Sequence, residues 1–267
     1  MDSALDISLA IITCVLYAAA AWRYALRFFH HTNESDVIAK SCAWLGCGSH
    51  GVFLIATIMS GDVQNMSMAN VFSLVAWLMT LSMMVSSFYF NNTILMPVIF
   101  GLSIAAVCLS VLIPDVYAVN VSIQPGLVVH IALSLFAYGI LLIALLYALQ
   151  VNYISHQLKQ KDGAILNSPL PPLMMLDRIL IKLLYASSLL LFVAIFSGSV
   201  FLDDMLNKQH AHKTVLSIIA LSVLLGTLLG QKLWGWRGKH LTTLVGIATL
   251  CLTLAYFGSR FVREVLL

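Results

Sequence analysis

Histidines are the residues of this sequence with the greatest capacity for chemistry. Of the eight, His50 and His130 fall inside long apolar segments, and the others lie at segment ends or between segments. An imidazole ligates metals through either ring nitrogen. Two imidazoles from different helices at similar depth could therefore both ligate a haem iron. The alternative is that each is a neutral histidine, hydrogen-bonded within a packed helix bundle.

Polar residues follow His130 at helical spacing. Ser134, Tyr138 and Leu141 come four, eight and eleven positions later, which places all four residues on one helix face. A flat apolar cofactor would suit such a face. Plain helix packing would suit it too, because small residues let neighbouring helices approach closely.

His210 and His212 lie in a short polar segment beside Lys208 and Lys213. On the topology predicted below, this segment and His130 share one side of the membrane. Either histidine could therefore approach His130 as a second ligand. The alternative is that both are ordinary solvated loop residues.

Several functional classes lack their motifs. The sequence contains no HExxH, GxSxG, P-loop or GxGxxG pattern, so we do not expect an enzyme. Its carboxylates lie at segment ends or between segments, which disfavours a proton or cation transporter. No basic arm or patch predicts nucleic-acid binding.

The elements that would position the histidines are predicted to be transmembrane helices. The chain is 61% hydrophobic and only 9% charged, and a span needs about 20 apolar residues. Continuous apolar stretches such as 140–148 exclude a β-barrel, whose strands alternate. We predict an all-α polytopic bundle in a single domain, 1–267, that contacts the lipid bilayer. Its eight helices are placed near 5–27, 37–59, 68–90, 93–114, 126–153, 177–201, 212–233 and 241–262.

Basic residues predict the orientation, because cytoplasmic loops are enriched in Lys and Arg. They concentrate after the first, fifth and seventh predicted helices. Both termini are then outside, as are His130, His210 and His212. Arg260 and Arg263 depart from this pattern near the outer face.

The five cysteines all fall in apolar segments. No pair has CxxC spacing, and none lies where an extracytoplasmic disulfide is expected. We interpret Cys14, Cys42, Cys47, Cys108 and Cys251 as small buried side chains.

Three strings carry a family resemblance: PGLVVHIALSLFAYGILLIALLYALQ at 125–150, LPPLMMLDR at 170–178 and KLWGWRGKHLTTLVGIATLCLTLAYFGSR at 232–260. Over roughly residues 40 to 262 the chain resembles the cytochrome c assembly family of haem-handling membrane proteins, and within it the HemX-like branch. The resemblance implies a multi-pass protein of the bacterial inner membrane. By position, it implies that His130 is the outer haem ligand and that His50 matches a histidine of an early helix.

The sequence also departs from the family pattern. The stretch FLDDMLNKQHAHKTVLS at 201–217 has no tryptophan where the family has a tryptophan-rich segment. Leu229, Gly230 and Gln231 stand where a later family histidine is expected. Two interpretations therefore remain: a protein that holds haem near the outer face, or a non-enzymatic partner of another membrane protein that kept the scaffold and lost the haem site.

Overall fold

The computed structural model describes residues 3–29, 37–59, 64–88, 94–113, 120–121, 125–159, 172–201 and 211–258. Within these ranges eight helices are long and apolar enough to cross a membrane, which confirms the predicted all-α polytopic class. They are α1 (Ser3–Phe29), α2 (Val37–Ile58), α3 (Met68–Ser86), α4 (Leu95–Leu112), α5 (Pro125–Lys159), α7 (Leu173–Phe201), α8 (Ala211–Trp234) and α9 (Lys239–Thr253), which continues as the π-helix η1 (Leu254–Gly258). The strands β1 (Gln64–Asn65) and β2 (Asn120–Val121) form one short antiparallel pair.

Helix ends differ from the predicted spans because hydropathy marks only the apolar part of a helix. The fifth helix continues past the predicted end at 153 to Lys159, through polar residues such as His156 and Gln157. It begins at Pro125, where a proline costs no hydrogen bond. Helix α7 begins directly after Pro172, four residues before its predicted start.

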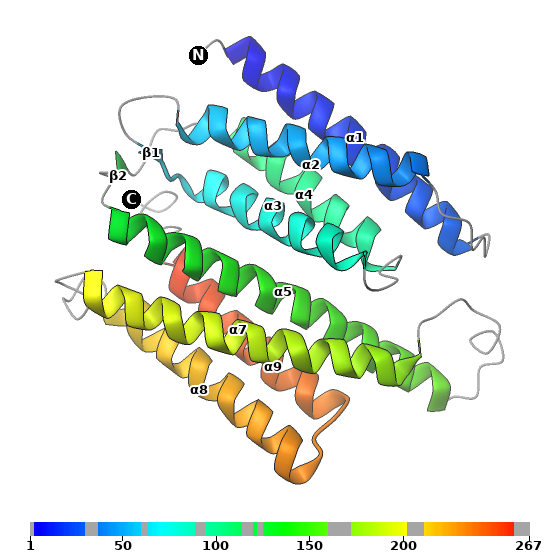
Figure 1. The fold of residues 1–267 in the computed structure, drawn as a ribbon, viewed down its shortest axis with the longest axis vertical. Helices are drawn as coiled ribbons and strands as arrows, with labels where there is room; N and C mark the ends of the chain where they lie inside the picture. Colours follow the sequence, from blue (N-terminus) through cyan, green and yellow to red (C-terminus); the bar gives the residue numbers. More distant parts are fainter. Residues whose placement is uncertain are drawn as a thin grey trace. The chain divides into compact units, whose positions relative to one another are not determined.

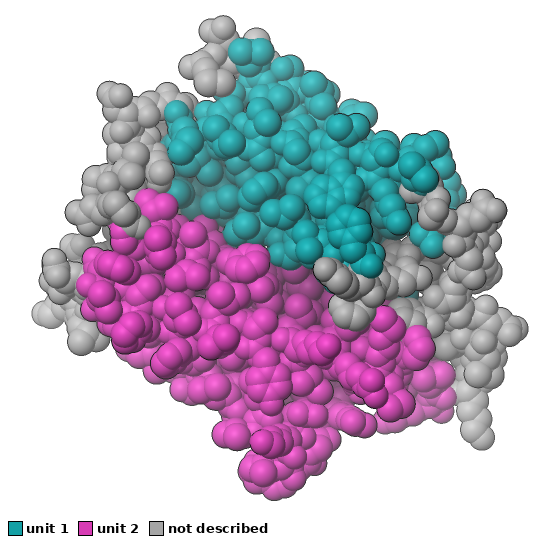
Figure 2. Space-filling model, in the orientation of Figure 1, with its two compact units in different colours: residues 1–123 teal, residues 124–267 magenta. Residues whose placement is uncertain are grey.

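The helices divide into two compact units, residues 1–123 and 124–267 (Figures 1 and 2). In unit 1, α1 and α3 each pack against both α2 and α4. In unit 2, α5 and α8 each pack against both α7 and α9. The single-domain prediction stays a prediction, because one membrane domain can contain two bundles.

Unit 1 has a core in which aromatic and polar side chains meet. Tyr17 of α1 is fully buried and stacks on Phe100 of α4, with 5.4 Å between ring centroids. Gly46 of α2 makes room for it, since a Cβ there would lie 2.9 Å from Cδ1 of Tyr17. The hydroxyls of Thr80 and Ser103 join α3 to α4 at 2.8 Å.

Large apolar side chains also cover the outside of the helices. On α7, Leu189, Phe192 and Phe196 are each more than half exposed. Such surfaces are costly in water and are stable against hydrocarbon. These residues therefore face the lipid bilayer. The prediction that both termini lie outside stays a prediction.

Candidate functional site

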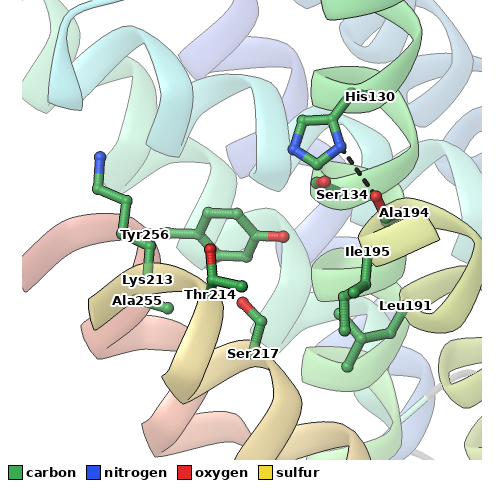
Figure 3. Close-up of a pocket in the computed structure, with 10 residues that line it drawn as sticks. All are labelled: His130, Ser134, Leu191, Ala194, Ile195, Lys213, Thr214, Ser217, Ala255 and Tyr256. Atoms are coloured by element: carbon green, nitrogen blue, oxygen red, sulfur yellow. Dashed lines mark hydrogen bonds between the residues drawn. The ribbon is translucent and has the colours of Figure 1, made fainter. Parts of the chain in front are cut away.

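His130 lies on the second turn of α5, where a neighbouring helix fixes its ring. Its Nδ1 is 2.9 Å from the backbone carbonyl oxygen of Ala194 on α7 and 3.2 Å from the Ser197 hydroxyl (Figure 3). Ser197 donates its own hydroxyl hydrogen to the Ala194 carbonyl at 2.8 Å, so its oxygen is left to accept.

These contacts determine which nitrogen of the neutral ring carries the proton. A carbonyl oxygen only accepts hydrogen bonds, so Nδ1 of His130 must be the donor. Nε2 then keeps its lone pair, and no described residue hydrogen-bonds it. Histidines that bind metals are oriented in this way, with the second nitrogen donating to a carbonyl or carboxylate.

A cavity of about 110 Å³ adjoins His130 within unit 2. Its apolar wall comes from α7. Its polar lining comes from α5, α8 and η1: His130, Ser134, Lys213, Thr214, Ser217 and Tyr256. In Figure 3 the imidazole and Lys213 lie at opposite ends of this cavity, and the Tyr256 hydroxyl points inward between them. The arrangement offers one metal-ligating nitrogen opposite hydroxyl and amino groups.

The π-helix η1 brings Tyr256 into the cavity. π-Helical segments are rare and occur often at functional sites. Tyr138 of α5 supports this segment, because its hydroxyl bonds the Thr253 hydroxyl at 2.8 Å and its ring lies 5.4 Å from the ring of Tyr256.

The structure brings only some of the predicted site residues together. Ser134 lines the cavity with His130, whereas Tyr138 is buried behind it. His212 is exposed at the start of α8 and does not line the cavity, although the adjacent Lys213 does. His210 lies outside the described residues.

His50 occupies a different setting, in the core of unit 1. It is fully buried, its Nδ1 is 3.3 Å from the Tyr17 hydroxyl, and its Nε2 is 2.9 Å from the Ser73 hydroxyl. Both ring nitrogens are therefore engaged. An iron ligand at His50 would require one of these buried hydrogen bonds to break.

The polar groups that line the cavity suit haem, whereas the volume of the cavity is too small for it. The Nε2 of His130 would suit a ligand of haem iron, and hydroxyl and amino groups would suit the haem carboxylates. Pockets that enclose drug-sized ligands usually measure about 300–1,000 Å³, so 110 Å³ cannot enclose a porphyrin. Among the described residues, no group of three His, Cys, Asp or Glu side chains could hold a metal ion.

The sequence analysis did not identify the cavity residues that come from α8 and η1. Lys213 and Ser217 are four residues apart, which was a usable sign that they share one face of α8. Thr214 lies beside Lys213 in sequence and belongs to the same wall. Nothing in the last apolar segment distinguished Tyr256, because its position depends on the π-helix.

Comparison with known proteins decides the family. The family model for cytochrome c assembly proteins matches residues 35–267. This chain belongs to the cytochrome c assembly protein family. Helix α1 precedes the matched residues of this family member.

Two relatives illustrate its place among membrane proteins. The chain is 35% identical over 234 residues to the inner membrane protein YpjD of Escherichia coli K12, covering 87% of this chain and 86% of YpjD. It is 36% identical over 140 residues, or 52% of each chain, to an uncharacterised 28.8 kDa protein of Azospirillum brasilense. No solved structure matches. Together with the eight spans, the likeness to YpjD identifies a multi-pass inner-membrane protein of the cytochrome c assembly family.

Proposed function

We propose that this family member binds haem near the outer face of the inner membrane and holds it without forming bonds in the macrocycle. The observation that carries the proposal is the Nε2 of His130, which has a lone pair, no described hydrogen-bond partner and a cavity beside it. The topology predicted from the distribution of Lys and Arg supports the outer location.

Two residues of α7 orient the ligand. The Ala194 carbonyl and the Ser197 hydroxyl hold Nδ1 of His130, so the ring does not need to be ordered when it binds iron. Preorganisation of this kind strengthens metal ligation. Haem would supply an iron centre that accepts a nitrogen ligand, and Nε2 of His130 would be that ligand.

The opposite wall would hold the carboxylates of the haem. Lys213, Ser217 and Tyr256 present an amino group and two hydroxyls there, and hydrogen bonds between a charged amine and a carboxylate are among the stronger ones. Because the cavity is too small to enclose a porphyrin, it would hold only part of the haem. Such a site, with one ligand from this chain, suits a protein that receives haem and releases it.

A second candidate is a non-enzymatic subunit that kept the scaffold and lost the cofactor. The small cavity and the fully engaged ring of His50 favour it. This second candidate function predicts that a membrane partner copurifies with the protein in a fixed ratio and that neither protein contains haem.

Titration of haemin into the purified protein tests the proposal. We expect His130→Ala to weaken binding by about 10- to 100-fold, the loss that even outer-sphere changes cause at metal sites. His156→Ala is the matched control, because His156 is exposed near the other end of the same helix. Equal affinity of wild type and His130→Ala, or no saturable binding by wild type, would overturn the proposal.

A further inference from the structure

Two cysteines far apart in sequence meet on the side of unit 1. Cys14 of α1 and Cys108 of α4 have their sulfurs 3.9 Å apart. No other pair of the five cysteines is in sulfur contact. The interpretation of all five as buried side chains is wrong for Cys108, which is exposed, while Cys14 is partly buried.

The surrounding helices hold this pair in place. Ala10 lies one turn before Cys14, and Val107 directly precedes Cys108; both belong to one buried cluster with Phe53, against which Cys14 packs. The seam between α1 and α4 therefore keeps the two thiols together. A disulfide has sulfurs about 2.05 Å apart, so closure requires the two sulfurs, now 3.9 Å apart, to approach by roughly 1.9 Å.

We propose that Cys14 and Cys108 are a redox-active dithiol that closes to an intramolecular disulfide between α1 and α4. Closure forms one S–S bond and breaks two S–H bonds. The two electrons and two protons pass to a lipid-soluble quinone, which becomes the hydroquinone. Cys108 is on the lipid-facing surface, one turn before the end of α4, where such an oxidant has access.

The disulfide would fasten α1, which precedes the residues matched by the family model, to a helix inside the matched region. Because the pair lies in unit 1 and His130 lies in unit 2, the inference is independent of haem binding.

Thiol counting on the full-length protein in detergent tests this inference. The reduced protein is oxidised with copper phenanthroline in air, denatured, and labelled with a maleimide. We expect wild type to lose two of its five reactive thiols. Cys14→Ser and Cys108→Ser should lose none, whereas Cys42→Ser, the matched control with a partly buried cysteine, should still lose two.

A peptide map of the oxidised wild type gives a second answer that needs no variant to fold. We expect a cross-linked pair of peptides that contain residues 14 and 108. Retention of all five thiols, or loss of two thiols in Cys14→Ser, would overturn the inference. A disulfide-linked dimer that requires Cys108 would also overturn it.

Discussion

Removal of the Ser73 hydroxyl tests whether His50 is a structural residue of unit 1. Ser73 is fully buried, and its hydroxyl lies 2.9 Å from Nε2 of His50. Ser73→Ala leaves that nitrogen buried without this partner. An unsatisfied buried polar group costs about 1–3 kcal/mol, but interhelical hydrogen bonds in membranes average about 0.6 kcal/mol with a maximum near 1.7. We therefore expect a loss of about 1–1.5 kcal/mol in the free energy of unfolding.

Reversible unfolding in mixed detergent micelles measures this loss. Ser110→Ala is the matched control, because that hydroxyl donates to the Val107 carbonyl of its own helix rather than to another helix, and the expected change is below about 0.5 kcal/mol. The haem affinity of Ser73→Ala should equal that of wild type. If Ser73→Ala is as stable as Ser110→Ala, or if it loses haem while folded, the reasoning about His50 is wrong.

Two further substitutions test packing in each unit. Gly46→Ala should destabilise unit 1 by about 1–3 kcal/mol through overpacking against the buried Tyr17 ring. Its control is Gly48→Ala on the same helix, where a new Cβ meets nothing within 4 Å, and this change should be neutral or stabilising. Equal thermal midpoints of the two variants would contradict this prediction. Tyr138→Phe removes the bond to the Thr253 hydroxyl and should cost about 0.5–1.5 kcal/mol. Its control, Tyr153→Phe, alters an exposed hydroxyl and should leave the unfolding midpoint unchanged, so a loss of the same size there would refute the role given to Tyr138.

The transmembrane spans were predictable because a backbone in lipid must satisfy its hydrogen bonds internally, and a long apolar segment does this as a helix. The exact ends of the helices were harder to predict. The α5 helix continues to Lys159 because helical hydrogen bonding does not depend on hydropathy, and η1 follows no simple composition rule. Ser134 and His130, four positions apart and so on one helix face, both line the cavity.

The rest of the site depends on contacts between helices, and these contacts could not be inferred from a single sequence. The fixed ring of His130 depends on a carbonyl of α7, and any residue at position 194 offers one. The two ring nitrogens of His50 meet Tyr17 and Ser73 from two other helices. A histidine in an apolar segment has the same local pattern whether its nitrogens are engaged or available, so sequence alone did not separate His50 from His130.

The visible spectrum of the protein purified from its own membranes tests the central claim most directly. We expect a Soret band in wild type, its loss in His130→Ala, and its return when imidazole is added to His130→Ala with haem, because free imidazole can replace the missing ligand. A colourless wild-type protein, or a Soret band that persists unchanged in His130→Ala, would contradict the assignment of His130 as the haem ligand.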